Sequence, residues 1–176
     1  MKKVLLLWRR LHYNVFVLNK FTQTNIFGLP VLLLLRNKFI KEAYKRRGVQ
    51  NPEKLVKKAL VDPQRSTIIW LADIFMCLLI IVLLFTLLNF VSSIYGSLIL
   101  GNLNKVVFLI ICLVPSLVLN YYALWQNDKY LTYFTNFEKE PKSLKRKWAW
   151  ISLAIILSIF SLLILSFIIM TKGIKR

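Results

Sequence analysis

The side chains best placed for chemistry are one acid, Asp73, inside a long apolar segment, and three polar residues, Asn120, Tyr121 and Tyr122, near the end of another. An ionisable residue in a membrane-spanning helix is costly and is by default a candidate for proton or ion transfer. Asp73 lies only about 9 Å inside the edge of its segment, at roughly 1.5 Å per residue. We therefore expect a structural carboxylate that hydrogen-bonds those three residues or reaches back to Arg65, with an ion relay as the alternative.

Other components of catalytic sites are scarce. The single histidine, His12, is expected at the surface of a helix. The two cysteines, Cys77 and Cys112, lie in apolar runs and lack the spacing of a metal site or a disulfide framework. The five glycines are isolated, so the sequence contains no glycine-rich phosphate-binding loop. We predict no catalytic residue, no metal ion and no cofactor.

Three apolar segments are long enough to position these residues in a bilayer. About 20 apolar residues cross a hydrocarbon core of roughly 30 Å, and residues 66–95, 104–126 and 148–171 meet that requirement. The chain of 176 residues is 57% hydrophobic and 18% charged, which is more typical of a membrane protein than of a soluble domain. The sequence predicts an all-α integral membrane protein with three transmembrane helices.

The distribution of Lys and Arg predicts how these helices are oriented. Fifteen of the 25 basic residues lie in residues 1–65, only Lys105 lies in the link to the second apolar segment, at the edge of that segment, and six lie in residues 127–147. Positively charged flanks stay on the cytoplasmic side. We therefore expect an N-terminus inside and a C-terminus outside, with a short outer tail at 172–176, in a bacterial cytoplasmic membrane.

Residues 1–65 are predicted to form basic, amphipathic helices at the cytoplasmic interface. The first has an apolar stripe, the second runs from Pro30 to residue 47 before Gly48, and the third is capped by Asn51 and stopped at Asp62. The apolar run 26–35 covers only about 15 Å as a helix, too little to cross a bilayer. The stripe of the first helix contains Val4, Leu7, Trp8, Leu11, Val15 and Leu18.

The connection at 127–147 combines aromatic and basic residues. Tyr130, Tyr133, Phe134 and Phe137 recur at helical spacing before Pro141. We expect a short cytoplasmic helix whose aromatic face packs against the N-terminal helices, which the charge pattern places on the same side of the membrane.

The basic residues of the N-terminal region predict an affinity for anionic lipid headgroups. Apolar stripes interleaved with basic residues favour a lipid surface over nucleic acid, because a bilayer accepts the apolar side chains as well as the charges. We predict no nucleic-acid partner. The predicted lipid contacts are Arg9, Arg10, Arg36, Lys38, Lys41, Lys45, Arg46 and Arg47.

The last apolar segment contains a helix-packing face. Ala154, Ser158 and Ser161 recur at spacings of four and three, so a second helix can approach this side closely. We therefore expect a non-enzymatic accessory, anchoring or inhibitory, immunity-like subunit that contacts another membrane component or a second copy of itself. One alternative is an oligomeric transporter or pore. A weaker one is an enzyme on lipid-linked substrates that uses Glu138, Glu140 or the intramembrane acid.

Overall fold

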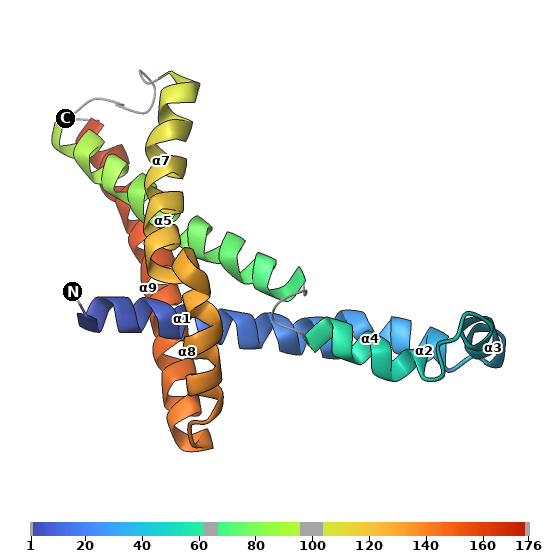
Figure 1. Ribbon diagram of the computed structural model, residues 1–176. Helices are drawn as coiled ribbons and strands as arrows, with labels where there is room; N and C mark the ends of the chain where they lie inside the picture. The colour runs from blue at the N-terminus through green and yellow to red at the C-terminus, as the bar shows by residue number, and fades with distance from the viewer. Residues whose placement is uncertain (1, 62–66, 96–103, 175–176) are drawn as a thin grey trace. The chain divides into compact units, whose positions relative to one another are not determined.

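The computed structural model describes residues 2–61, 67–95 and 104–174, and every regular element in these ranges is helical (Figure 1). The prediction of an all-helical chain is confirmed for these residues. In chain order the elements are α1 (Lys2–Thr22), the π-helix η1 (Gln23–Phe27), α2 (Gly28–Leu35), α3 (Lys38–Arg46), α4 (Pro52–Val61), α5 (Thr67–Tyr95), α7 (Lys105–Asn120), the π-helix η2 (Tyr121–Trp125), the 3-10 helix η3 (Gln126–Asp128), α8 (Lys129–Glu138) and α9 (Lys142–Ile174).

Three helical stretches are long and apolar enough to cross a membrane, as the sequence predicted. They are Ile68–Tyr95, Lys105–Trp125 and Lys142–Lys172. The third begins before the apolar segment because Lys142, the basic residues 145–147 and their neighbours continue the helix instead of forming a loop.

The chain divides into two compact units, residues 1–11 with 74–176 and residues 12–73. The first unit therefore includes the beginning of α1 and most of α5, whereas the sequence placed all of residues 1–65 in one N-terminal region. Within it, Phe85 of α5 makes ring contacts with Phe108 of α7 and Phe167 of α9, at centroid distances of 6.1 and 5.6 Å. These contacts join the three long helices.

The predicted apolar stripe of α1 is only partly buried. Leu11 and Val15 are buried, but Val4 and Leu18 are exposed. Burial instead surrounds the middle of the helix, where Arg10, His12, Tyr13 and Phe16 are also buried.

The predicted second helix, residues 30–47, is divided in two between α2 and α3. Asn37 has an extended backbone (φ −62°, ψ 130°), and its side chain accepts a hydrogen bond from the Phe39 N–H at 3.1 Å. A local side-chain bond of this kind competes with helix continuation and favours a new N-cap. The sequence analysis missed this cap because Asn37 lies within an otherwise helical pattern.

Two predicted helix boundaries in this region are confirmed. Gly48 follows α3 with a φ of 80°, a conformation that favours glycine, and donates its N–H to the Lys45 carbonyl at 2.9 Å. The Asn51 side chain accepts from the Lys54 N–H at 3.2 Å and caps α4. The predicted stop at Asp62 lies outside the described residues.

The short aromatic helix after the second long helix is also confirmed. The chain continues from α7 through η2 and η3 into α8. The left-handed backbone of Asn127 (φ 57°), in η3, separates α7 from α8. Tyr133, Phe134 and Phe137 of α8 are buried. Asparagine accepts this conformation more readily than most residues, which explains how the direction changes there without glycine.

Candidate functional site: the Arg10 clamp and its neighbours

Three consecutive residues of α1 make polar contacts within the first unit. The Trp8 indole N–H donates to the Asn120 side-chain oxygen at 3.0 Å, and Arg9 Nε donates to the Ala123 carbonyl at 3.2 Å. Arg10 donates through both terminal nitrogens to the two carboxylate oxygens of Glu140. The beginning of α1 is thus bound at the end of α7, at η2 and after α8.

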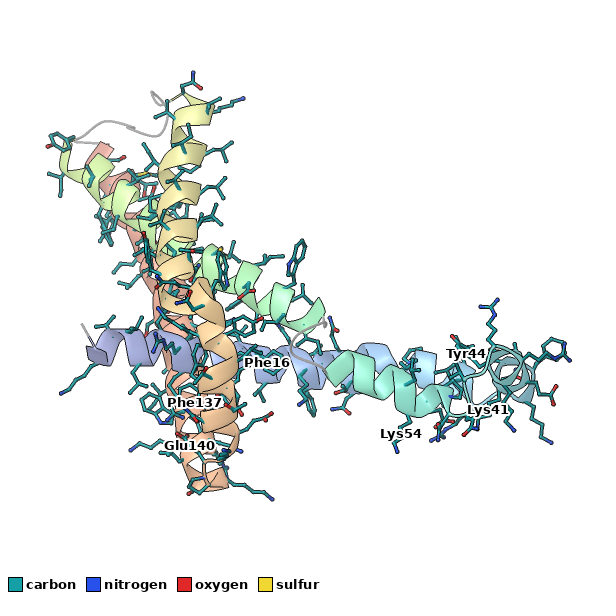
Figure 2. All side chains as sticks on the ribbon, in the orientation of Figure 1. Phe16, Lys41, Tyr44, Lys54, Phe137 and Glu140 are labelled. Carbon is teal, nitrogen blue, oxygen red and sulfur yellow. The ribbon has the colours of Figure 1, made fainter. Side chains whose placement is uncertain are left out.

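Arg10 is enclosed by aromatic rings as well as by its carboxylate partner. Its guanidinium carbon lies 3.8 Å from the ring centroid of Phe137 and 5.0 Å from that of Trp148, and the residue is only 8% exposed. A bidentate guanidinium–carboxylate pair is among the stronger hydrogen-bonded contacts, and each ring adds a cation–π attraction. We call Arg10, Phe137, Glu140 and Trp148 the Arg10 clamp; Figure 2 labels Phe137 and Glu140 at the end of α8.

The turn between α8 and α9 places Glu140 in the clamp. Pro141 follows Glu140 and lacks the N–H that would continue α8, and the Glu140 N–H closes a turn on the Phe137 carbonyl at 3.3 Å. The Lys145 ammonium donates to the Glu138 carbonyl at 2.6 Å, which stabilises the C-terminal end of α8. Glu138 itself is exposed, so Glu138 and Glu140 differ in environment.

The electrostatics of the clamp favour an ionised Glu140. The hydrogen bonds from Arg10 lower the pKa of the Glu140 carboxyl, with a further contribution from the charge of Lys145; partial burial opposes them. The charged form of Glu140 is therefore the form that holds Arg10 at neutral pH.

Asn120 has partners other than those predicted from the sequence. It is fully buried, accepts from Trp8 and donates through its side-chain nitrogen to Cys77 Sγ at 3.2 Å. Tyr121 and Tyr122 are exposed and contact each other edge to face at 5.4 Å. The amide therefore joins α1, α5 and α7, and the two tyrosines lie at the surface.

Asp73 is paired with the histidine, within the second compact unit. The His12 Nε2 atom lies 3.0 Å from Asp73 Oδ1, and His12 is 0% exposed. The expectation of a surface histidine was wrong, because the middle of α1 is buried nearly all round rather than along one stripe. An acid in an apolar helix needs a polar neighbour, but nothing in the sequence distinguishes His12 from the other polar side chains as that neighbour.

The predicted lipid contacts fall into two groups. Arg9 and Arg10 point into the first unit, and the burial of Arg10 contradicts its assignment to lipid headgroups. Lys41, which Figure 2 labels, forms an ion pair with Glu53 at 3.2 Å. The remaining five are all exposed: Arg36, Lys38, Lys45, Arg46 and Arg47.

Comparison of this chain with protein-family models, curated proteins and solved structures finds no match. Its function is therefore inferred from its own residues and contacts.

The helix-packing face of α9 lies away from the contacts that α9 makes within the chain. Ala154, Ser158 and Ser161 are exposed, and the Ser158 hydroxyl donates to the Ala154 carbonyl of its own helix at 2.8 Å. Ile159 and Ser166, which are buried, lie on a different side of the helix. At roughly 100° per residue, Ser166 is about 80° from Ser158 around the helix axis.

The arrangement favours structural roles for the two acids. Glu140 is bound by an arginine and Asp73 by a histidine, and each contact joins segments far apart in the sequence. Within the described ranges, no cluster of three or more His, Cys, Asp or Glu side chains could hold a metal ion.

Proposed function

We propose that this chain is an integral membrane protein in which α5, α7 and α9 cross the bilayer. The observation that carries the proposal is the wide apolar exterior of these helices: many large apolar side chains are exposed, while several polar side chains are buried between the helices. The exposed set includes Leu87, Val91, Leu109, Leu113, Leu157 and Ile164, and the buried polar set comprises Thr86, Asn89, Ser92, Ser116, Asn120, Ser152 and Ser166. Such an apolar exterior suits a lipid solvent and disfavours water.

Hydrogen bonds between α5 and α9 support this proposal. The Asn89 side-chain nitrogen donates to the Ser166 hydroxyl at 3.1 Å, and the Ser93 hydroxyl donates to the Ile169 carbonyl at 3.2 Å. Interhelical bonds of this kind contribute about 0.6 kcal/mol each on average in membranes, where apolar surface alone does not drive helices together.

The function best supported is a non-enzymatic accessory, anchoring or inhibitory role exercised through contact with another membrane helix. The helix-packing face of α9 is exposed and formed by small side chains, so it allows close approach of a further helix. Glu140, an acid that an enzyme would use, is bound to Arg10. The orientation proposed is N-terminus inside and C-terminus outside, in a bacterial cytoplasmic membrane.

Two measurements test membrane insertion and orientation. The chain should stay in the membrane pellet after alkaline carbonate extraction. Reporter fusions at residues 48, 101 and 173 should indicate inside, outside and outside. An inside signal at residue 173 would contradict the proposed number of crossings.

A substitution on α9 tests the contact function. Ser158→Phe should abolish co-purification with the partner or with a second, differently tagged copy, because a ring blocks close approach. Leu153→Phe is the matched control, since Leu153 is also exposed but lies roughly 140° from Ser158 and at least 80° from the other residues of the face around the helix. Equal co-purification by both variants would exclude this face as the contact.

Transport is the second candidate, favoured by the His12–Asp73 pair, because an ionisable pair beside an apolar segment is a common feature of ion pathways. Purified protein in liposomes should be inert if the accessory role is right. Saturable or voltage-dependent flux that Asp73→Ala abolishes would replace that role with transport.

A further inference from the structure

We propose that one surface of α2 and α3 is a docking site for anionic phospholipid headgroups, with Phe39 as its apolar anchor. The inference rests on the proposed membrane insertion and deepens it by naming the lipid class and the side chains. The basic–apolar surface comprises Leu33, Leu34, Arg36, Lys38, Phe39, Lys45, Arg46 and Arg47, all of them exposed.

The two sides of α3 differ in the way that docking requires. Ile40 and Tyr44 are half-buried and mark the inner side of the helix. Phe39 is 83% exposed. At roughly 100° per residue, Phe39 lies within about 20° of Arg46 around the axis and about 100° from Lys38. The outer side therefore presents an aromatic ring with Arg46 beside it, and the exposed Glu42 lies about 60° from the ring, between Phe39 and Lys38.

Charge complementarity identifies an anionic partner. Lys41 is bound to Glu53 and Arg10 to Glu140, so these two cations are already engaged within the chain. The five basic residues of the surface carry no such ion pair among the described residues. Glu42 is the single acid between residues 33 and 47 and is exposed on the same helix. The surface thus has a large excess of positive charge available to a partner.

The apolar residues favour a bilayer over a nucleic acid. Phosphates of RNA or DNA bind basic side chains but leave Leu33 and Leu34 in water. The interface of a bilayer accepts leucine and phenylalanine below its headgroups while the basic residues contact the phosphates. Arg47 also lies only about twenty residues before the first residue of α5, which keeps this surface close to the membrane that α5 is proposed to enter.

Hydrogen–deuterium exchange of the full chain in nanodiscs tests the inference. Amides of α3 should exchange at least tenfold more slowly in discs of phosphatidylcholine with 30% phosphatidylglycerol than in phosphatidylcholine alone. Each basic residue near an anionic surface contributes roughly fivefold to binding. The triple variant Lys45→Gln, Arg46→Gln, Arg47→Gln should lose this protection at low salt, and 0.5 M NaCl should weaken it in the parent chain.

Two single variants separate the apolar and charged contributions. Phe39→Ala should reduce protection several-fold at both salt concentrations, because burial of a ring is insensitive to salt. Glu42→Gln should increase protection by removing the opposing charge. Leu55→Ala is the matched control: Leu55 is an exposed apolar residue of α4 outside the surface, and its loss should leave protection unchanged.

Equal exchange in the two kinds of disc would overturn the inference. Protection by an RNA oligonucleotide in phosphatidylcholine discs, at a lower phosphate concentration than the lipid requires, would also overturn it in favour of nucleic acid. Release by carbonate together with protection on phosphatidylglycerol vesicles would refute the proposed membrane insertion and leave this docking surface standing.

Discussion

The Arg10 clamp is expected to dominate the stability of the contact between α1 and the α8–α9 turn. Replacing Arg10 by alanine leaves the Glu140 carboxylate, 20% exposed at its side chain, without its bidentate partner and removes two ring contacts. Breaking a buried ion pair typically costs about 3–5 kcal/mol. Because Glu140 keeps some access to solvent, we expect a loss near the lower end, about 3 kcal/mol.

The variant Glu140→Gln separates the contribution of the Glu140 charge from that of its side-chain shape. Glutamine keeps one hydrogen bond and leaves the contacts of Arg10 with Phe137 and Trp148, so the expected loss is about 1–2 kcal/mol. The assay is unfolding of the detergent-solubilised protein, followed by tryptophan fluorescence, with a double-mutant cycle on Arg10 and Glu140. The matched control is the more solvent-accessible pair Lys41–Glu53, with side chains 44% and 28% exposed, whose coupling should stay below about 1 kcal/mol. A coupling below that of the control would refute the clamp as a stabilising contact.

The clamp also gives stability a definite pH dependence. The pKa of Glu140 is lower in the folded chain than in the unfolded chain, chiefly because Arg10 hydrogen-bonds the carboxylate. Its contribution is therefore fully present above the unfolded value of about 4.3 and is lost as pH falls through the folded pKa. In the Glu140→Gln variant, the free energy of unfolding should fall less steeply as the pH is lowered below about 5. An unchanged acid slope in this variant would assign the dependence to other groups.

Three further substitutions test individual contacts. His12→Ala should destabilise the protein by about 2–3 kcal/mol, because it removes a fully buried side chain from the middle of α1 together with its contact with Asp73; parent-like thermal unfolding would contradict this. Asn89→Ala should cost about 1 kcal/mol by removing its bond to Ser166, and parent-like unfolding would show that this bond is incidental. Gly48→Ala should cost about 1 kcal/mol through its φ of 80°, since no atom lies within 4 Å of an added Cβ; no loss in denaturant unfolding would show that the turn adapts.

Long apolar segments and helix caps could be predicted from sequence because their physics is local. The length of an apolar run can be counted in the sequence, and Gly48 and Asn51 end or cap helices through hydrogen bonds to residues at most four positions away. The Arg10 clamp could not be predicted in this way. Arg10 and Glu140 are separated by 130 positions in the sequence. The residues around Arg10 in α1 give no sign that it is buried, whereas Lys45 in α3 is exposed. The charge of a basic residue is visible in the sequence, whereas the acid within reach depends on the fold.

The contacts of α1 bear on membrane orientation independently of charge counts. Arg9 and Arg10 contact Ala123, Phe137 and Glu140 in the first compact unit, so the beginning of α1 and the α8–α9 turn belong on the same side of any bilayer. Two candidate crossings, α5 and α7, lie between the beginning of α1 and the α8–α9 turn along the chain. An even number of crossings returns the chain to the side of the membrane on which it started. We therefore predict that the third candidate crossing, α9, places the C-terminus on the opposite side.

This argument gives a direct test of orientation. In intact cells, cysteines introduced at the exposed positions Lys3 and Lys139 should be equally protected from a membrane-impermeant thiol reagent, and both should react after permeabilisation. Cysteine at Lys172, near the end of α9, should react before permeabilisation. Labelling of Lys3→Cys without labelling of Lys139→Cys would place the clamp residues on opposite sides and would contradict both the proposed orientation and the Arg10 clamp.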